Sequence, residues 1–256
     1  MKFVDFLGDD RLRYKIVYTR DSYTECVYCG EKADTREHVP SKVFLVKPYP
    51  AFLGIVPACF KCNNSFSSDE LFLSILIEKL KSIYYGEKYI LSEETIGRIN
   101  KYKKIANQID MAIANKRINE FDKRISRVLF KLAIGHAVFE VSEGYCIKEG
   151  IVSYSFRDSM SNEEIEEFSA PFILNGQVFP EVGSRAFERI IVVEMDLASV
   201  HDPEQKINTR LALLEWVDVQ ATKYSYTSYL FGDEIVVKII INEFLYAQVI
   251  IRLDDN

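Results

Sequence analysis

The sequence predicts an α+β fold in which a cysteine-rich segment comes first, helices follow, and antiparallel strands end the chain. Two C-x-x-C pairs lie within the first 67 of the 256 residues. Apolar residues then recur at helical spacing up to about residue 141, and runs of β-branched and aromatic residues dominate after Gly144. We therefore divide the chain into the segments 1–67, 68–144 and 145–256.

The composition is typical of a globular protein. Apolar residues make up 48% of the chain and charged residues 27%, which excludes global disorder. No apolar run approaches the roughly 20 residues of a membrane span, and the N-terminal sequence MKFVDFLGDDR lacks the core of a signal peptide. We expect a cytoplasmic protein that does not contact a membrane.

The first segment contains the spacing C-x2-C-x29-C-x2-C, formed by Cys26, Cys29, Cys59 and Cys62. Two residues between the thiols of a pair let both sulfurs reach one tetrahedral ion at about 2.3 Å. In a reducing compartment this spacing predicts a structural zinc site, which would stabilise a segment poor in core residues. Two unrelated reduced pairs are the alternative. A redox pair is less favoured, because neither pair lies between a strand and a helix that would activate a thiolate.

The residues between the pairs include Arg36-Glu37-His38-Val39-Pro40-Ser41-Lys42, and Asn63 directly follows the last cysteine. Over residues 20–75, this order resembles the HNH endonucleases of the ββα-metal class in which two cysteine pairs brace the motif. The resemblance implies a zinc-braced ββα-metal (HNH) module that extends into a helix from about residue 68. An ordinary polar turn before a proline is the alternative interpretation of the motif.

The activity that the resemblance implies is metal-dependent hydrolysis of phosphodiester bonds, with DNA favoured over RNA. His38 would then be the general base, and Glu37 and Asn63 would hold a catalytic Mg²⁺ or Mn²⁺ through oxygen atoms. Neighbouring residues of a strand face opposite sides. Glu37 and His38 therefore both reach the metal region only if the strand is bulged or twisted there.

The chain departs from the family pattern at Gly54, where the family has a middle asparagine that orients the base. A backbone carbonyl or Asn64 would then orient His38, or the nuclease would be slow or inactive. Asp69 and Glu70 would either add a carboxylate near the metal or simply favour the N-terminus of a helix.

The middle segment predicts three helices, with breaks near Gly86 and at Asn115–Lys116. Ser92 is followed by two glutamates, which is typical of a helix N-cap. Residues 1–135 hold 23 Lys and Arg against 17 Asp and Glu, a charge of +6, whereas residues 136–256 hold 9 against 21, a charge of −12. Contact with nucleic acid phosphates, or a solvated helix face, would explain the helical basic residues Lys101, Lys103, Lys104, Lys116, Arg117, Lys123, Arg124 and Arg127.

The last segment predicts antiparallel strands. Residues 224–231, 234–241 and 244–253 are separated by short turn sequences and favour a meander, with earlier strands at 150–156 and 189–195. This region would position the substrate, bind a protein partner or form a homo-oligomer.

The remaining reactive residues carry weaker signals. His136 follows an apolar helix face and fits a packed core histidine, whereas His201 lies in a loop-like His-Asp-Pro stretch that fits a surface position. Cys146 stands outside both pairs and fits a lone reduced thiol.

Three functional hypotheses follow. The first is an HNH nuclease, which similar bacterial and phage proteins place in a defence or mobile-element setting. The second is a zinc-braced nucleic-acid-binding module without catalysis, and the third is a structural zinc domain that serves protein assembly. His38 favours the first hypothesis, because a binding module has no need of the Glu-His-Val-Pro element.

Overall fold

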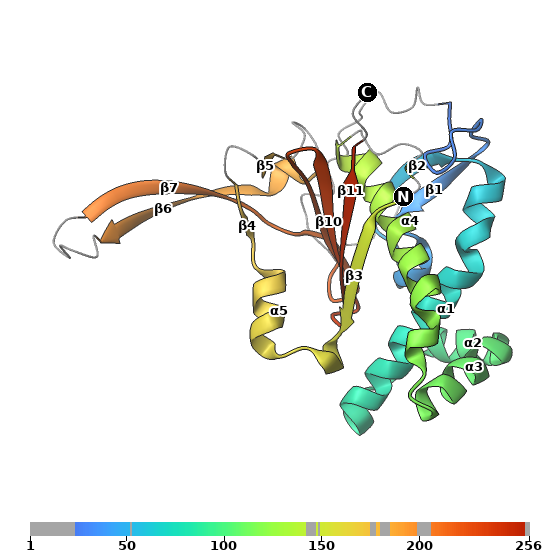
Figure 1. Ribbon diagram of the computed structural model, residues 1–256. Coiled ribbons are helices and arrows are strands. Elements are labelled where there is room, and N and C mark those ends of the chain that lie inside the picture. Colours follow the sequence, from blue (N-terminus) through green and yellow to red (C-terminus); the bar gives the residue numbers. More distant parts are fainter. Residues whose placement is uncertain are drawn as a thin grey trace.

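The structure, a computed structural model, describes residues 24–51, 53–141, 147, 149–174, 178–179, 185–198 and 206–253. It combines helices with antiparallel sheets, as the sequence predicts. The expectations for Cys146 and His201 lie outside the described residues. Figure 1 shows that the long helix α4 (Asp122–Val141) runs between the N-terminal elements and the C-terminal sheet.

The N-terminal elements are a β-hairpin followed by a long helix. Strand β1 (Thr35–Val39) pairs antiparallel with β2 (Gly54–Ala58), and helix α1 (Phe60–Tyr85) follows directly. A short 3-10 turn, η3 (Lys42–Phe44), lies between the strands. The pairing runs without a register shift from Thr35 opposite Ala58 to Val39 opposite Gly54. Alternate side chains of both strands therefore face α1 and α4.

Helix α1 begins at Phe60, well before the predicted start near Ser68. The N-cap is Cys59, whose Sγ accepts the backbone N–H of Cys62 at 3.4 Å. Sequence periodicity missed this first turn because its residues serve the cysteine pair instead of an apolar face.

The rest of the middle segment contains three helices, so the predicted helix that includes Ile96 and Ile109 is in fact two. Helix α2 spans Glu93–Lys101 and α3 spans Lys103–Ala114, because Tyr102 leaves the helical region at φ −113° and ψ 48°. The predicted N-cap is confirmed, since the Ser92 side chain accepts the N–H of Thr95 at 3.2 Å. Two 3-10 turns complete the segment, η4 (Gly86–Lys88) and η5 (Ile118–Phe121).

The predicted meander is confirmed in the C-terminal sheet. Strands β9 (Tyr224–Phe231), β10 (Glu234–Ile241) and β11 (Leu245–Arg252) pair antiparallel in sequence order. Strand β3 (Ile151–Phe156) adds to the free edge of β11. Two short strands pair with β9, namely β5 (Val178–Phe179) and β8 (Val217–Gln220).

A second, smaller sheet has the order β4-β7-β6. Strands β6 (Ile190–Ala198) and β7 (Lys206–Leu214) form a long two-stranded ribbon that projects from the body of the molecule (Figure 1), and β4 (Phe172–Ile173) pairs with its base. Helix α5 (Asn162–Ser169) precedes β4, follows the turn η6 (Arg157–Ser159), and begins with a capping box between Ser161 and Glu164. A further turn, η7 (Phe187–Arg189), leads into β6.

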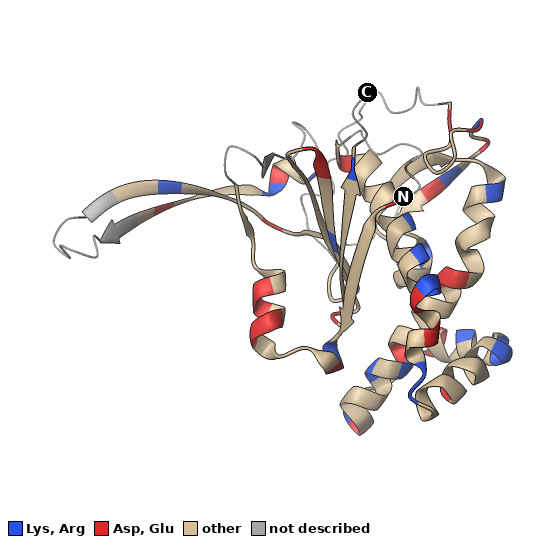
Figure 2. Ribbon diagram, in the orientation of Figure 1, with Lys and Arg blue, Asp and Glu red and all other residues tan. Residues whose placement is uncertain are grey.

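One hydrophobic cluster includes residues from the hairpin, the helices and the C-terminal sheet. Alternation along β10 and β11 directs one face of each strand inward, and these side chains are fully or almost fully buried: Ile235, Val237, Ile239, Ile241, Leu245, Ala247, Val249 and Ile251. The three predicted segments thus contribute to one core. The domain boundaries that we placed at residues 67 and 144 stay predictions. In Figure 2, much of the ribbon of α5 is coloured red for acidic residues, and parts of the ribbon at α2 and α3 are blue for basic residues.

Candidate metal centre and active site

Two local turns bring the four paired cysteines together. Cys26 and Cys29 lie in the turn before β1, where the Cys26 carbonyl accepts the N–H groups of Cys29 and Gly30 at 3.3 and 2.9 Å. Cys59 and Cys62 lie at the start of α1. The four Sγ atoms all lie within 4.8 Å of one another, and none forms a disulfide. The cluster can therefore hold a metal ion such as zinc.

The sulfur spacing fits a tetrahedral ion. Sγ atoms bound at about 2.3 Å in a tetrahedron stand about 3.8 Å apart, and the Sγ atoms of Cys29 and Cys59 are 3.8 Å apart. Polar contacts hold the two turns in place: Asp34 accepts the N–H of Phe60 at 2.6 Å, and the Thr35 hydroxyl donates to the Ala58 carbonyl at 2.8 Å. The cluster thus joins the hairpin to α1.

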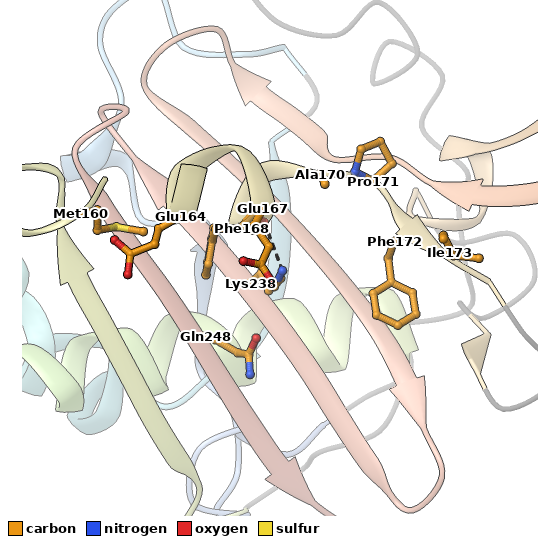
Figure 3. A pocket seen from close by; sticks show the side chains of 10 residues that line it. All are labelled: Met160, Glu164, Glu167, Phe168, Ala170, Pro171, Phe172, Ile173, Lys238 and Gln248. Atoms are coloured by element: carbon orange, nitrogen blue, oxygen red, sulfur yellow. Dashed lines mark hydrogen bonds between the residues drawn. The ribbon is translucent and has the colours of Figure 1, made fainter. Parts of the chain in front are cut away.

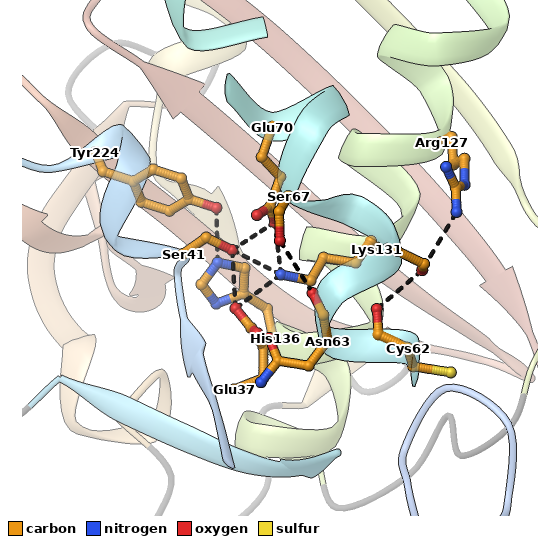
Figure 4. Close-up of polar contacts among 11 residues, drawn as sticks. Glu37, Ser41, Cys62, Asn63, Ser67, Glu70, Arg127, Lys131, His136 and Tyr224 are labelled. Carbon is orange, nitrogen blue, oxygen red and sulfur yellow. Dashed lines mark hydrogen bonds and ion pairs between the residues drawn. The ribbon is translucent and has the colours of Figure 1, made fainter. Parts of the chain in front are cut away.

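A second polar centre lies inside the protein, where β1 meets α1 and α4 (Figure 4). The Lys131 ammonium, only 2% exposed, donates to Glu37 Oε1 at 2.9 Å, to Glu70 Oε1 at 2.6 Å and to Ser41 Oγ at 2.6 Å. The Ser41 hydroxyl in turn donates to Glu70 at 2.6 Å. All three ammonium protons have acceptors, which is what a buried lysine needs to remain charged.

Each carboxylate of this centre binds its partners through only one of its two oxygen atoms. Glu37 and Glu70 bind Lys131 and Ser41 through Oε1, and their Oε2 atoms have no hydrogen-bond partner among the described residues. The Asn63 side chain donates from Nδ2 to Thr35 at 3.2 Å, which leaves Oδ1 unused in the same part of the chain. Carboxylate and amide oxygens are the ligands that Mg²⁺ and Mn²⁺ prefer, so the chemistry of Glu37 and Asn63 fits such an ion.

His38 lies on the other face of the hairpin from Glu37. The unbroken register of β1 with β2 places Glu37 opposite Val56 on the inner face, and His38 opposite Ile55 on the outer face. The bulge that would turn both side chains to one side is absent from these strands. The structure therefore brings Glu37 and Asn63 to the same side and directs His38 away from them.

The His38 ring is nevertheless chemically suited to accept a proton. Partial burial, reinforced by the positive charges of Lys42 and Lys131, lowers the pKa of His38 from its usual value of 6.5. The imidazole is therefore neutral at pH 7. Its Nδ1 is buried and has no hydrogen-bond partner among the described residues.

The structure explains the glycine at position 54. A Cβ atom on Gly54 would lie 3.1 Å from the Phe139 ring of α4 and 3.1 Å from Nη2 of Arg185. An asparagine does not fit there without displacing both side chains. Gly54 therefore offers His38 no side-chain partner, and Asn64 is exposed on α1.

The adjacent acidic residues Asp69 and Glu70 have different partners. Asp69 accepts from Arg124 at 2.5 Å and from Arg127 at 2.6 Å, so it links α1 to α4. The same guanidinium groups lie over the rings of Phe72 and Phe66, at 4.1 and 4.7 Å. Arg124 and Arg127 thus have internal partners, whereas Glu70 belongs to the Lys131 centre.

Sequence reasoning missed Lys131 and Ser41. The available signal is a single charged residue inside the apolar run Val128-Leu129-Phe130-Lys131-Leu132-Ala133-Ile134. A lysine in a helix that is buried on most sides requires a carboxylate partner, and β1 supplies one in Glu37.

His136 is a packed core histidine, as the sequence predicts. It is completely buried, its Nε2 lies 2.8 Å from the Tyr224 hydroxyl, and its ring stacks on Tyr226. Burial, with the charges of Arg185 and Lys131, lowers its pKa well below the usual value, so the ring is neutral. The same side of α4 carries Glu140, which accepts from Tyr226 and from Arg185.

Comparisons with known proteins give no relative: no family model, curated protein or solved structure matches the chain. None of the helices in the described part of the chain combines the length and the apolar character that crossing a bilayer requires.

We predict that the four-cysteine cluster binds one zinc ion per chain and stabilises the fold. Elemental analysis of protein purified without added metal should find about one zinc per chain. Cys59→Ala should lose the zinc and lower the melting temperature, because the hairpin loses its link to α1. Cys146→Ala, outside both pairs, is the control and should keep the zinc. A metal-free protein that melts like the zinc-loaded one would contradict the prediction.

We predict that Lys131→Met destabilises the protein by about 3–5 kcal/mol, because it leaves two buried carboxylates without their cation. Urea unfolding measures this free energy. The control is Arg117→Met, which breaks the exposed pair with Glu120 and should cost less than about 1 kcal/mol. Combining Lys131→Met with Glu37→Gln and Glu70→Gln should recover part of the loss. If Lys131→Met were as stable as wild type, the Lys131 ammonium would not stabilise the carboxylates of Glu37 and Glu70.

Proposed function

We propose that the N-terminal unit is an HNH-type nuclease module that hydrolyses phosphodiester bonds with the help of a divalent cation, with DNA as the first candidate substrate. The observation that carries the proposal is His38, a neutral histidine on a hairpin that the four-cysteine cluster joins to the following helix. The element order β1, β2, α1 supports the same assignment.

In this proposal, His38 removes a proton from the attacking water, because a neutral imidazole has one ring nitrogen free to accept a proton. The accepting nitrogen would be Nε2, since Nδ1 is buried. Glu37 and Asn63 would hold the Mg²⁺ or Mn²⁺ ion through Oε2 and Oδ1. When bound, the ion would polarise the phosphate and stabilise the leaving oxygen. Lys131 keeps the Glu37 carboxylate in one orientation through Oε1.

Glu37 and His38 lie on opposite faces of β1, which limits where a substrate can bind. β1 pairs only with β2 among the described strands, so its other edge has no strand beside it. A phosphodiester would have to lie along this edge to approach both the inner residue Glu37 and the outer residue His38.

A second candidate function is nucleic acid binding without catalysis. The separation of Glu37 and His38 on opposite faces favours it, as does the closed space at Gly54. The zinc-braced hairpin would then act only as a rigid recognition element.

Both functions need a surface that contacts phosphates. Lys101, Lys103 and Lys104 are exposed where α2 meets α3, and the ribbon of these helices is partly blue for Lys and Arg in Figure 2. Arg124 and Arg127 are already paired with Asp69. We therefore assign the phosphate contacts to the lysines of α2 and α3, and retain a bacterial defence or mobile-element role as part of the proposal.

We predict that His38→Ala lowers cleavage by about 10²–10⁴-fold, the usual contribution of a positioned acid–base group. Zinc content and melting temperature should change little, because His38 does not belong to the cysteine cluster. Asn63→Ala should instead raise the concentration of Mn²⁺ needed for half-maximal rate. The assay should offer single- and double-stranded DNA and RNA with Mg²⁺ or Mn²⁺.

The control for this experiment is Arg36→Ala, the exposed residue two positions before His38 on the same face of β1. It should retain cleavage within a few-fold of wild type. If wild type binds these nucleic acids and cuts none of them, the second candidate function replaces the first.

We predict that reversing Lys101, Lys103 and Lys104 to Glu weakens nucleic acid binding and reduces its dependence on salt, because fewer counterions are released. Fluorescence anisotropy at several salt concentrations measures both quantities. The control is Lys88→Glu together with Lys32→Glu, two exposed lysines outside α2 and α3. An unchanged affinity and salt slope in the triple variant would identify these lysines as a solvated face only.

A further inference from the structure

A groove of about 790 Å³ lies between α5 and the outer face of the C-terminal sheet, away from the hairpin (Figure 3). Its volume is in the range of small-molecule sites. The α5 side supplies Met160, Glu164, Glu167 and Phe168, the chain toward β4 supplies Ala170, Pro171, Phe172 and Ile173, and the sheet supplies Lys238 and Gln248.

Lys238 is a cation on the floor of the groove, in the middle of β10. Its ammonium donates to the Phe168 carbonyl at 3.1 Å and lies 4.5 Å from the centre of the Phe168 ring. Burial lowers the pKa of Lys238 from its usual value, against the opposing effect of Glu167. The carbonyl uses one of three donor protons, so a partly desolvated ammonium retains capacity to bind an anionic group.

Polar residues flank Lys238 on both neighbouring strands. Thr227 of β9 and Gln248 of β11 lie directly opposite it in the sheet, on the same face. Of these two neighbours, Gln248 lines the groove beside Lys238, whereas Thr227 is only 3% exposed and does not line it. The Gln248 amide can therefore share the binding of a polar group with the Lys238 ammonium.

The rim of the groove has the opposite charge. Glu167 is exposed on α5, close enough to Lys238 to affect its pKa. Glu164 also lines the groove, with one oxygen bound to the N–H of Ser161. Phe168 and Phe172 add aromatic walls, and Phe172 stacks on the mostly buried Tyr229.

We propose that this groove binds an α-amino acid with a large apolar or aromatic side chain. The ligand carboxylate binds Lys238 and Gln248, its ammonium group binds Glu167, and its side chain packs between Phe168 and Phe172. The pattern of charge selects for a zwitterion, because a simple anion is repelled by the rim glutamates and a simple cation by Lys238. The inference is independent of the proposed nuclease function.

Isothermal titration calorimetry on the full chain tests the proposal with L-phenylalanine as the probe. L-phenylalaninamide, which lacks the carboxylate, and N-acetyl-L-phenylalanine, which lacks the ammonium group, are the matched ligands. We expect L-phenylalanine to bind at least about tenfold more tightly than either, because each analogue leaves one charged group of the groove unpaired.

Variants identify the groove as the site. Lys238→Met and Glu167→Gln should each weaken binding of L-phenylalanine by about tenfold or more. Lys123→Met on α4 and Glu166→Gln on α5 are matched controls at exposed positions outside the groove and should bind like wild type. Circular dichroism confirms that each variant is folded.

Three outcomes would overturn the proposal. They are no measurable heat with L-phenylalanine, equal affinity for all three ligands, and wild-type affinity in a folded Lys238→Met variant. Tight binding of N-acetyl-L-phenylalanine alone would instead assign the groove to a simple carboxylate.

Discussion

The contact on which the rest of the structure depends is the ammonium of Lys131. It holds carboxylates from β1 and α1, through Glu37 and Glu70, and the hydroxyl of Ser41 in the loop after β1. Burying these charges is costly unless every group is paired, so the hairpin has one favourable position against the two helices. Because α4 also packs against the C-terminal sheet, this single side chain couples the N-terminal unit to the rest of the protein.

The hairpin is fixed at two places by different chemistry. The four-cysteine cluster lies at the exposed end, where Cys29 is solvent-accessible, and the Lys131 centre lies in the interior. A short two-stranded sheet is marginal by itself, so the Lys131 centre, together with any metal ion held by the cysteines, would make the hairpin more rigid. The two oxygens of the Glu37 carboxylate differ in this respect. Oε1 accepts hydrogen bonds from Lys131 and Ser41, whereas Oε2 has no partner among the described residues.

Charge separation along the chain has a spatial counterpart. The exposed lysines of α2 and α3 belong to the first half of the chain, whereas Glu164 and Glu167 of α5, which line the groove, belong to the second half (Figures 2 and 3). The acidic α5 would repel a polyanion, so nucleic acid and an amino acid ligand would occupy separate parts of the surface. Each surface can therefore be tested without disturbing the other.

The sequence by itself determined the local features. The cysteine spacing predicted the four-sulfur cluster, Ser92 predicted the start of a helix, and the turns between residues 224 and 253 predicted the meander. The helix start and the meander depend on residues a few positions apart, whose geometry the backbone nearly fixes. The cluster combines two such local turns, and the tetrahedral preference of zinc for four thiolates predicts that the distant pairs meet. Only the tertiary structure decided that Lys131 would bind Glu37, that Phe139 and Arg185 would close the space at Gly54, and that Lys238 and Glu167 would line one groove. These contacts join residues far apart in the sequence, so no local pattern reveals them. For Lys131 and Glu37, burial makes the contact necessary, because a desolvated charge must find its partner wherever the fold places one.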